Sequence, residues 1–97
     1  MTGDCVLDLN TFRNKIDETD DSIVKLLMER FAVVKEIAEY KKERGLDIFQ
    51  QARETEIMKK IADKIDNEEY RDYILKIYSE ILDASKSLQR KSNSSSS

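Results

Sequence analysis

The chain has 97 residues, enough for one small domain, and combines 38% charged with 39% hydrophobic residues. It contains no His and one Cys, which excludes a Ser-His-Asp triad, a His-ligated zinc site, an intramolecular disulfide and a four-cysteine metal site. The net charge of -3 argues against nucleic-acid binding, because such binding depends on neutralising phosphates.

The composition also indicates the fold class. Two Gly and no Pro, in a chain rich in Lys, Glu, Leu and Ile, predict an all-α fold. No apolar run approaches the roughly 20 residues of a membrane span, and the first residues do not resemble a signal peptide, so we expect a cytoplasmic protein. One helical domain is expected over residues 7–91, followed by a disordered Ser-rich tail over residues 92–97.

The first predicted helix spans about residues 9–44. Asp8 or Asn10 is expected to cap its start, and Gly45 is expected to end it after a basic last turn. Apolar side chains recur along it with helical spacing and form one long stripe. They are Leu9, Phe12, Ile16, Ile23, Leu26, Leu27, Val33, Val34, Ile37 and Ala38.

Two shorter helices are predicted after the first. The second spans about residues 50–65 and the third about residues 68–89, with a turn near Asp66 and Asn67. Each repeats apolar residues at steps of three and four, so one face of each helix is expected to pack against another element.

The length of the first helix predicts an assembly. About 36 residues span roughly 54 Å at 1.5 Å per residue, whereas a compact globule of about 97 residues is only about 35 Å across. The apolar stripe therefore extends beyond any globule that one chain can form, and a second copy is the simplest cover. We predict three helices per chain in an intertwined, six-helix homodimer with two-fold symmetry.

Charged residues interrupt the stripe of the first helix. Lys41 follows Arg30 by 11 residues. The helical rotation over 11 residues differs from three full turns by only about 20°, so the two cations lie on the same face of the helix, about 16 Å apart along its axis. A cation on an apolar face is costly unless it is paired or hydrogen-bonded. Either each side chain extends from the edge of the stripe to water, or both serve a ligand. Arg13 lies too far along the helix to meet Lys41 within one chain, but it can reach across a dimer interface.

Polar residues also stand at key places in the other two helices. Arg53 and Glu54 fall in the first turns of the second helix, where a solvated charged turn is the simpler interpretation. In the third helix, Ser85 and Gln89 continue the stripe of Ile81 at four-residue steps, so either the helix frays there or these groups face a pocket.

Taken together, these side chains predict a polar pocket inside a helical bundle. Guanidinium groups bind carboxylates through paired hydrogen bonds, and Lys adds a compact donor, so the expected ligand is a small dicarboxylate. The sequence offers no nucleophile beside a base and no metal site. An enzyme with this pocket would act by positioning and electrostatics, with no cofactor.

The ordered set of these residues resembles the all-helical chorismate mutases. No single motif is specific, but the set at these spacings is. It consists of residues 9–17, Asp20, residues 26–30, residues 37–41, the pair Arg53 and Glu54, and the pair Ser85 and Gln89.

The resemblance implies a three-helix chain in an intertwined dimer with two active sites. It also implies the activity of an isomerase, the Claisen rearrangement of chorismate to prephenate in the biosynthesis of Tyr and Phe. This intramolecular reaction needs no acid, base or nucleophile, which fits the absence of His. Catalysis would come from holding the compact conformer and from stabilising charge on the breaking ether oxygen.

The resemblance further implies which residues act on the reacting atoms. Lys41 would donate to the ether oxygen with the assistance of Gln89, and Glu54 would accept from the ring hydroxyl. The contacts of Lys41 and Gln89 would stabilise the transition state, and the contact of Glu54 would orient the substrate.

The remaining residues would bind the substrate's carboxylates and frame the site. Arg30 would bind a carboxylate from within the subunit, and Arg13 would reach one from the partner subunit. Arg53 and Ser85 would line the carboxylate side. Gln50 stands where several family members have Asp, and it retains the ability to hydrogen-bond a hydroxyl.

Three other interpretations remain open at this stage. A relative on the same scaffold eliminates pyruvate from isochorismate, and the sequence does not separate the two substrates. A helical dimerisation module would use the same charges only to set register. The chain could also be a regulatory domain taken from a longer enzyme.

Overall fold

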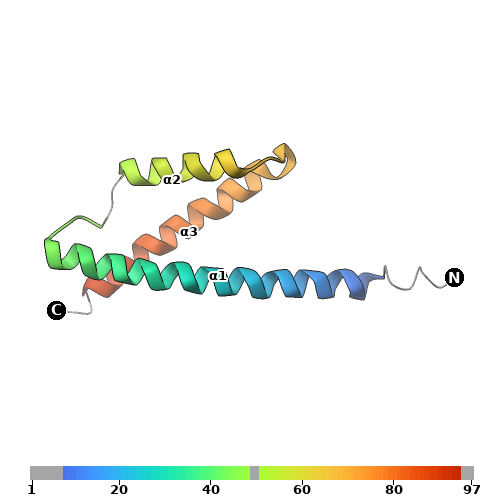
Figure 1. The fold of residues 1–97 in the computed structure, drawn as a ribbon, viewed down its shortest axis with the longest axis horizontal. Helices are drawn as coiled ribbons and strands as arrows, with labels where there is room; N and C mark the ends of the chain where they lie inside the picture. The colour runs from blue at the N-terminus through green and yellow to red at the C-terminus, as the bar shows by residue number, and fades with distance from the viewer. Residues whose placement is uncertain (1–7, 49–50, 95–97) are drawn as a thin grey trace. The chain divides into compact units, whose positions relative to one another are not determined.

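The computed structural model describes residues 8–48 and 51–94, with the side chains of residues 93 and 94 excepted. These residues form three helices, α1 over Leu9–Arg44, α2 over Gln51–Lys64 and α3 over Glu68–Ser94, and no strand (Figure 1). The prediction of an all-α chain is confirmed. Within the described residues, no helix is both long and apolar enough to cross a membrane. Residues 1–32 and 33–97 form two compact units, which we describe separately.

Local capping groups define both ends of α1. Asp8 Oδ1 accepts hydrogen bonds from Thr11 N at 2.9 Å and from Thr11 Oγ1 at 3.1 Å, so Asp8 is the N-cap. At the other end, Gly45 adopts a φ of 66°. Leu46 N then donates to Lys41 O at 2.8 Å, and Gly45 N to Lys42 O at 3.3 Å. This is a Schellman ending, which requires a residue with positive φ just after the helix.

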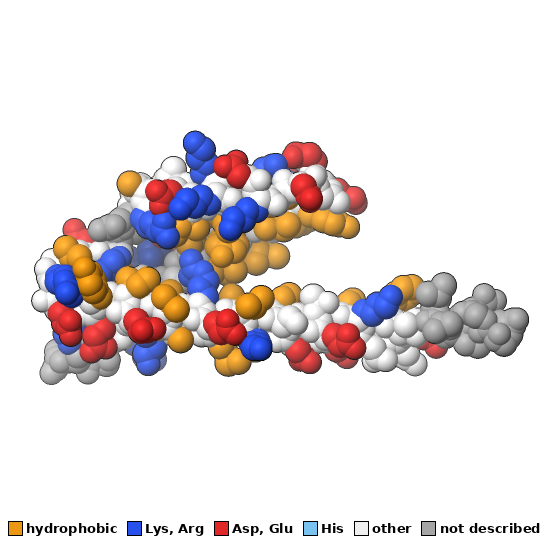
Figure 2. Space-filling view, in the orientation of Figure 1, with side chains coloured by type: hydrophobic (Ala, Val, Ile, Leu, Met, Phe, Trp, Pro, Cys, Tyr) orange, Lys and Arg blue, Asp and Glu red, His pale blue; other side chains and the backbone are white. Residues whose placement is uncertain are grey.

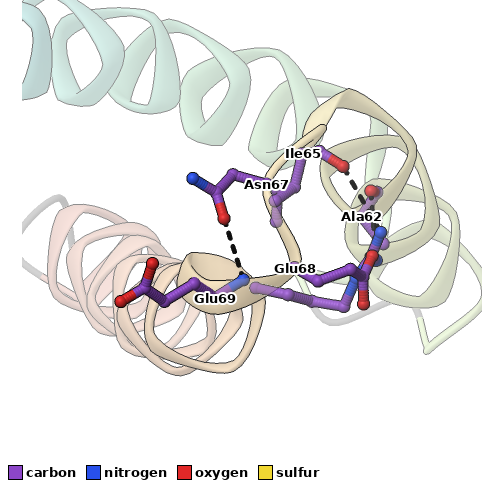
Figure 3. A network of polar contacts seen from close by, with 6 residues as sticks. Ala62, Ile65, Asn67, Glu68 and Glu69 are labelled. Atoms are coloured by element: carbon purple, nitrogen blue, oxygen red, sulfur yellow. Dashed lines mark hydrogen bonds and ion pairs between the residues drawn. The ribbon is translucent and has the colours of Figure 1, made fainter.

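Helices α2 and α3 pack on one another within the unit of residues 33–97. The turn between them follows from the Asn67 side chain, whose Oδ1 accepts from Glu69 N at 2.9 Å and caps the start of α3 (Figure 3). The predicted turn near Asp66 and Asn67 is therefore confirmed.

Arg71, in the first turn of α3, forms hydrogen bonds across the same turn. Its guanidinium donates to the carbonyl of Ala62 at 3.2 Å and to that of Ile65 at 3.3 Å. Its Nε also donates to Glu68 Oε2 at 2.9 Å. Because the last carbonyls of a helix lack partners within the helix, this side chain satisfies the end of α2 and joins it to α3.

The third helix is longer than the sequence pattern predicts. It continues past Gln89 to Ser94, so residues 92–94 are helical where a disordered tail was predicted. Ser and Asn disfavour a helix by only about 0.5 kcal/mol each, and no Gly or Pro is present to end it. Residues 95–97 lie outside the described residues.

Among the side chains that the structure describes, the buried ones lie in the unit of residues 33–97. They are Val34 and Ala38 of α1 and Leu82, Ser85 and Gln89 of α3. Over residues 8–32, in contrast, no side chain is buried. Figure 2 shows hydrophobic side chains at the surface along α1, and Leu9, Ile16 and Leu26 are all more than half exposed. Most of the predicted apolar stripe of α1 is therefore uncovered within one chain.

Candidate active site

The buried face of α3 carries two polar side chains. Ser85 and Gln89 are 6% and 8% exposed and share that face with Leu82, because steps of three and four residues return to the same side of a helix. Ser85 Oγ donates to Ile81 O at 2.8 Å. Gln89 Oε1 is buried and has no hydrogen-bond partner. Helix α3 continues past both residues to Ser94, and the Gln89 side chain leaves an unpaired buried acceptor one turn from Ser85.

Lys41 lies in the last turn of α1, and its ammonium is held by the following linker. The side chain is half-buried, and Nζ donates to Ile48 O at 3.0 Å. The Schellman ending folds the chain back toward Lys41 and so brings this carbonyl within reach. An ammonium has three N–H donors, so this bond leaves donors for a ligand.

An open hollow of about 500 Å³ adjoins this end of α1. Its wall is mainly apolar, and Lys41 and Glu36 are its two charged lining residues. The lining residues are Glu36, Ile37, Tyr40, Lys41 and Leu46. The hollow has the size of a small-molecule site.

Arg53 and Glu54 are adjacent in α2, and their side chains point in different directions. Arg53 is exposed and pairs with Glu56 one turn later. Glu54 is half-buried and faces α3, where Lys86 Nζ lies 3.2 Å from its Oε2 and 3.5 Å from its Oε1. Consecutive helical residues diverge by about 100°, which explains the separation. The structure therefore gives Glu54 a partner on α3, and it gives Arg53 a partner within α2.

The remaining predicted site residues are Arg13, Arg30 and Gln50. Arg13 is exposed and Arg30 is half-buried, both in the unit of residues 1–32. Gln50 lies outside the described residues.

Sequence reasoning missed Lys86. It lies on α3 next to Ser85 but off the apolar stripe, and its partner Glu54 is 32 residues away. A charged residue on the flank of a stripe gives no periodic signal, so only the packing of α2 on α3 reveals the contact.

The described side chains favour electrostatic chemistry. They bring ammonium, hydroxyl, amide and carboxylate groups to half-buried or buried positions. Among the described residues, no group of three or more His, Cys, Asp or Glu could hold a metal ion. Such groups can bind and orient a polar anionic molecule and stabilise charge that develops on it.

Comparison with known proteins finds a family model and two relatives that each match most of the chain. The family model for chorismate mutase type II matches residues 12–90. The chain is 36% identical over 89 residues to the bifunctional chorismate mutase/prephenate dehydratase of Aquifex aeolicus, covering 87% of this chain but 24% of that protein. It is 34% identical over 83 residues to the chorismate mutase of Methanocaldococcus jannaschii, covering 84% of each. The chain thus spans about a quarter of the first relative and most of the second.

Proposed function

Because the chain belongs to the type II chorismate mutase family, we propose that it catalyses the rearrangement of chorismate to prephenate. The observation that carries the proposal is the family match over residues 12–90, which includes every candidate site residue. Two buried polar side chains on α3, Ser85 and Gln89, support it further, since a packed apolar core has no need of them.

The reaction breaks a carbon–oxygen bond and forms a carbon–carbon bond within one molecule. Negative charge builds on the ether oxygen as the bond breaks, and donors aimed at that oxygen stabilise the transition state more than the substrate. We assign this role to Lys41, assisted by the amide of Gln89. The bond from Lys41 to Ile48 O supports the assignment, because it restrains the ammonium while other N–H groups stay available.

We assign the binding of the substrate's two carboxylates to arginine residues. We assign Arg30 to a carboxylate within the subunit and Arg13 to one reached from a partner subunit, with Arg53 and Ser85 on the same side. Binding both carboxylates at fixed positions favours the compact conformer in which the reacting carbons approach each other.

The ring hydroxyl is assigned to Glu54. A carboxylate accepts hydrogen bonds only, so it suits a hydroxyl that must donate. We assign Gln50 to the same hydroxyl as a further hydrogen-bonding group.

A homodimer is part of the proposal. Helix α1 is 36 residues long, and its apolar residues are exposed over most of its length, with Phe12 at 47% and Ile23 at 49%. A contiguous exposed apolar face of this kind marks an interaction surface, and a second α1 has the matching length. We also propose a cytoplasmic location, which cell fractionation tests.

The experiment for the function follows chorismate absorbance with wild-type protein and with Lys41→Ala. Wild-type protein should consume chorismate and release prephenate, and Lys41→Ala should lower kcat by about 10²–10³-fold or more. Lys42→Ala is the matched control, because Lys42 is the exposed neighbour of Lys41 in the same helical turn. It should retain the wild-type rate.

One result would refute the function, and another would refute only the role assigned to Lys41. A folded wild-type protein that leaves chorismate unchanged excludes the mutase, and release of pyruvate from isochorismate would then identify the lyase. A Lys41→Ala variant with wild-type kcat excludes the assigned donor.

The dimer is tested by mass and by complementation. Light scattering should give twice the chain mass, and the thermal midpoint should fall on dilution. Arg13→Ala and Lys41→Ala, each inactive alone, should regain activity when mixed, because hybrid dimers contain one intact site. Proven subunit exchange without recovery would place Arg13 and Lys41 in the same subunit's site.

A further inference from the structure

The ion pair between Lys86 and Glu54 joins two helices. It connects α2 to α3 across 32 residues, whereas five other ion pairs each join residues within one helix, namely Arg44–Glu43, Arg53–Glu56, Lys60–Glu56, Arg71–Glu68 and Lys86–Asp83. The Lys86 side chain is 20% exposed and the Glu54 side chain 23%. Each of the other pairs has at least one side chain that is more than half exposed. A pair shielded in this way is screened less by salt and holds its geometry better than a surface pair.

The geometry of this pair restrains the whole carboxylate. Lys86 Nζ lies 3.2 Å from Glu54 Oε2 and 3.5 Å from Oε1, so the ammonium faces both oxygens. Two ionised oxygens offer about four lone-pair positions, and one ammonium occupies only part of them. Glu54 therefore retains acceptor capacity while its rotation is restricted.

The place of Lys86 on α3 ties it to the buried polar face. It follows Ser85 and precedes Gln89 by three residues, and both neighbours are buried. A displacement of α3 would therefore move Lys86 together with these two side chains. The ammonium also lies 3.5 Å from Asp83 Oδ1, but the Asp83 side chain is 61% exposed. Glu54 is accordingly the more shielded of these two carboxylate partners.

We infer that Lys86 is a positioning residue for the active site, which fixes the Glu54 carboxylate so that it accepts from the substrate's ring hydroxyl. This inference rests on the proposed function, because it assigns Lys86 a task in binding chorismate. Lys86 acts through Glu54 and does not touch the substrate. Its loss should weaken binding of the hydroxyl, which is present in substrate and transition state alike, so the effect should appear mainly in KM.

The experiment is a double-mutant cycle on chorismate turnover with Lys86→Met, Glu54→Gln and the double variant. Lys86→Met should lower kcat/KM by about 10- to 100-fold, mainly through KM, as expected for a misplaced contact group. Lys86→Arg should restore most of this loss, because a guanidinium also donates to both carboxylate oxygens. In the Glu54→Gln background, Lys86→Met should add less than about threefold, since coupled residues are not additive.

Two controls separate positioning from general charge effects. Asp83→Asn removes the exposed partner of the same ammonium, and Lys76→Met removes an exposed cation from the same helix. Each should stay within about twofold of wild type, as surface changes usually do. If circular dichroism shows that Lys86→Met is unfolded, Lys86→Gln replaces it in the cycle with the same criteria.

The outcomes separate a failure of the positioning role of Lys86 from a failure of the proposed mutase activity. The positioning role is overturned, and the mutase assignment stays intact, if the wild type is active and Lys86→Met leaves kcat/KM unchanged. The same holds if Lys86→Met lowers kcat/KM equally in the wild-type and Glu54→Gln backgrounds. A loss that Lys86→Arg does not restore also overturns it. A folded wild type that does not convert chorismate overturns both.

Discussion

Replacement of Gln89 by Leu should stabilise the fold and lower activity at the same time. Gln89 is 8% exposed, and its Oε1 is buried without a hydrogen-bond partner. The folded chain therefore bears the cost of removing that oxygen from water. Leu has a similar size and no polar atom, and it would extend the apolar surface that Leu82 provides on the same face.

The size of the effect follows from the unpaired oxygen. A buried acceptor without a partner costs about 1–3 kcal/mol, so relieving it should raise the free energy of unfolding by about 1–2 kcal/mol. For a domain of this size, 1 kcal/mol shifts Tm by about 4–8 °C, so Tm should rise by at least about 4 °C. Loss of the amide donor should lower kcat by about 10²-fold.

The assay combines thermal unfolding by circular dichroism with chorismate turnover. All variants are compared at one protein concentration, because the proposed dimer would make Tm depend on concentration. Gln51→Leu is the control, since Gln51 is exposed and its loss should change stability by less than about 0.5 kcal/mol. A lower Tm for Gln89→Leu would show that Oε1 is satisfied in the working protein. Full activity would show that Gln89 takes no part in the reaction.

Two further substitutions test the local interactions that shape the chain. Arg71→Ala removes the bonds to the carbonyls of Ala62 and Ile65 and to Glu68, and should lower stability by about 1–3 kcal/mol, read as a lower urea midpoint with an unchanged m-value. An unchanged midpoint would mean that water replaces the guanidinium at no cost. Gly45→Ala should cost about 1–2 kcal/mol from the φ of 66° alone, since an added Cβ meets nothing within 4 Å. Gly45→Asn should cost less, because Asn tolerates this conformation, and equal stability of the Ala variant would refute the argument.

The helices were largely predictable because their ends depend on neighbouring residues. Asp8 and Gly45 bound α1 as expected, through contacts within a few residues. The end of α3 was predicted five residues too early, at Gln89 instead of Ser94. Composition alone suggested a disordered tail there, but weak propensities do not stop a helix that has no breaker.

The candidate site was predictable in its residue types but not in its contacts. Ser85 and Gln89 are visible in the sequence as polar residues that interrupt the apolar stripe of α3, and the structure shows both side chains to be buried. The pairing of Glu54 with Lys86 is not visible in that pattern, because it depends on how α2 lies against α3.

The sequence by itself determined the three helices, the caps of α1 and the polar side chains that interrupt the apolar stripes, because these depend on spacing and on neighbours within one or two turns. Only the tertiary structure decided that Gln89 Oε1 is buried without a partner, that Lys41 is held by Ile48 O and that Glu54 faces Lys86. Burial and contacts between distant residues depend on how helices and linkers pack, and periodicity along one helix carries no information about that packing.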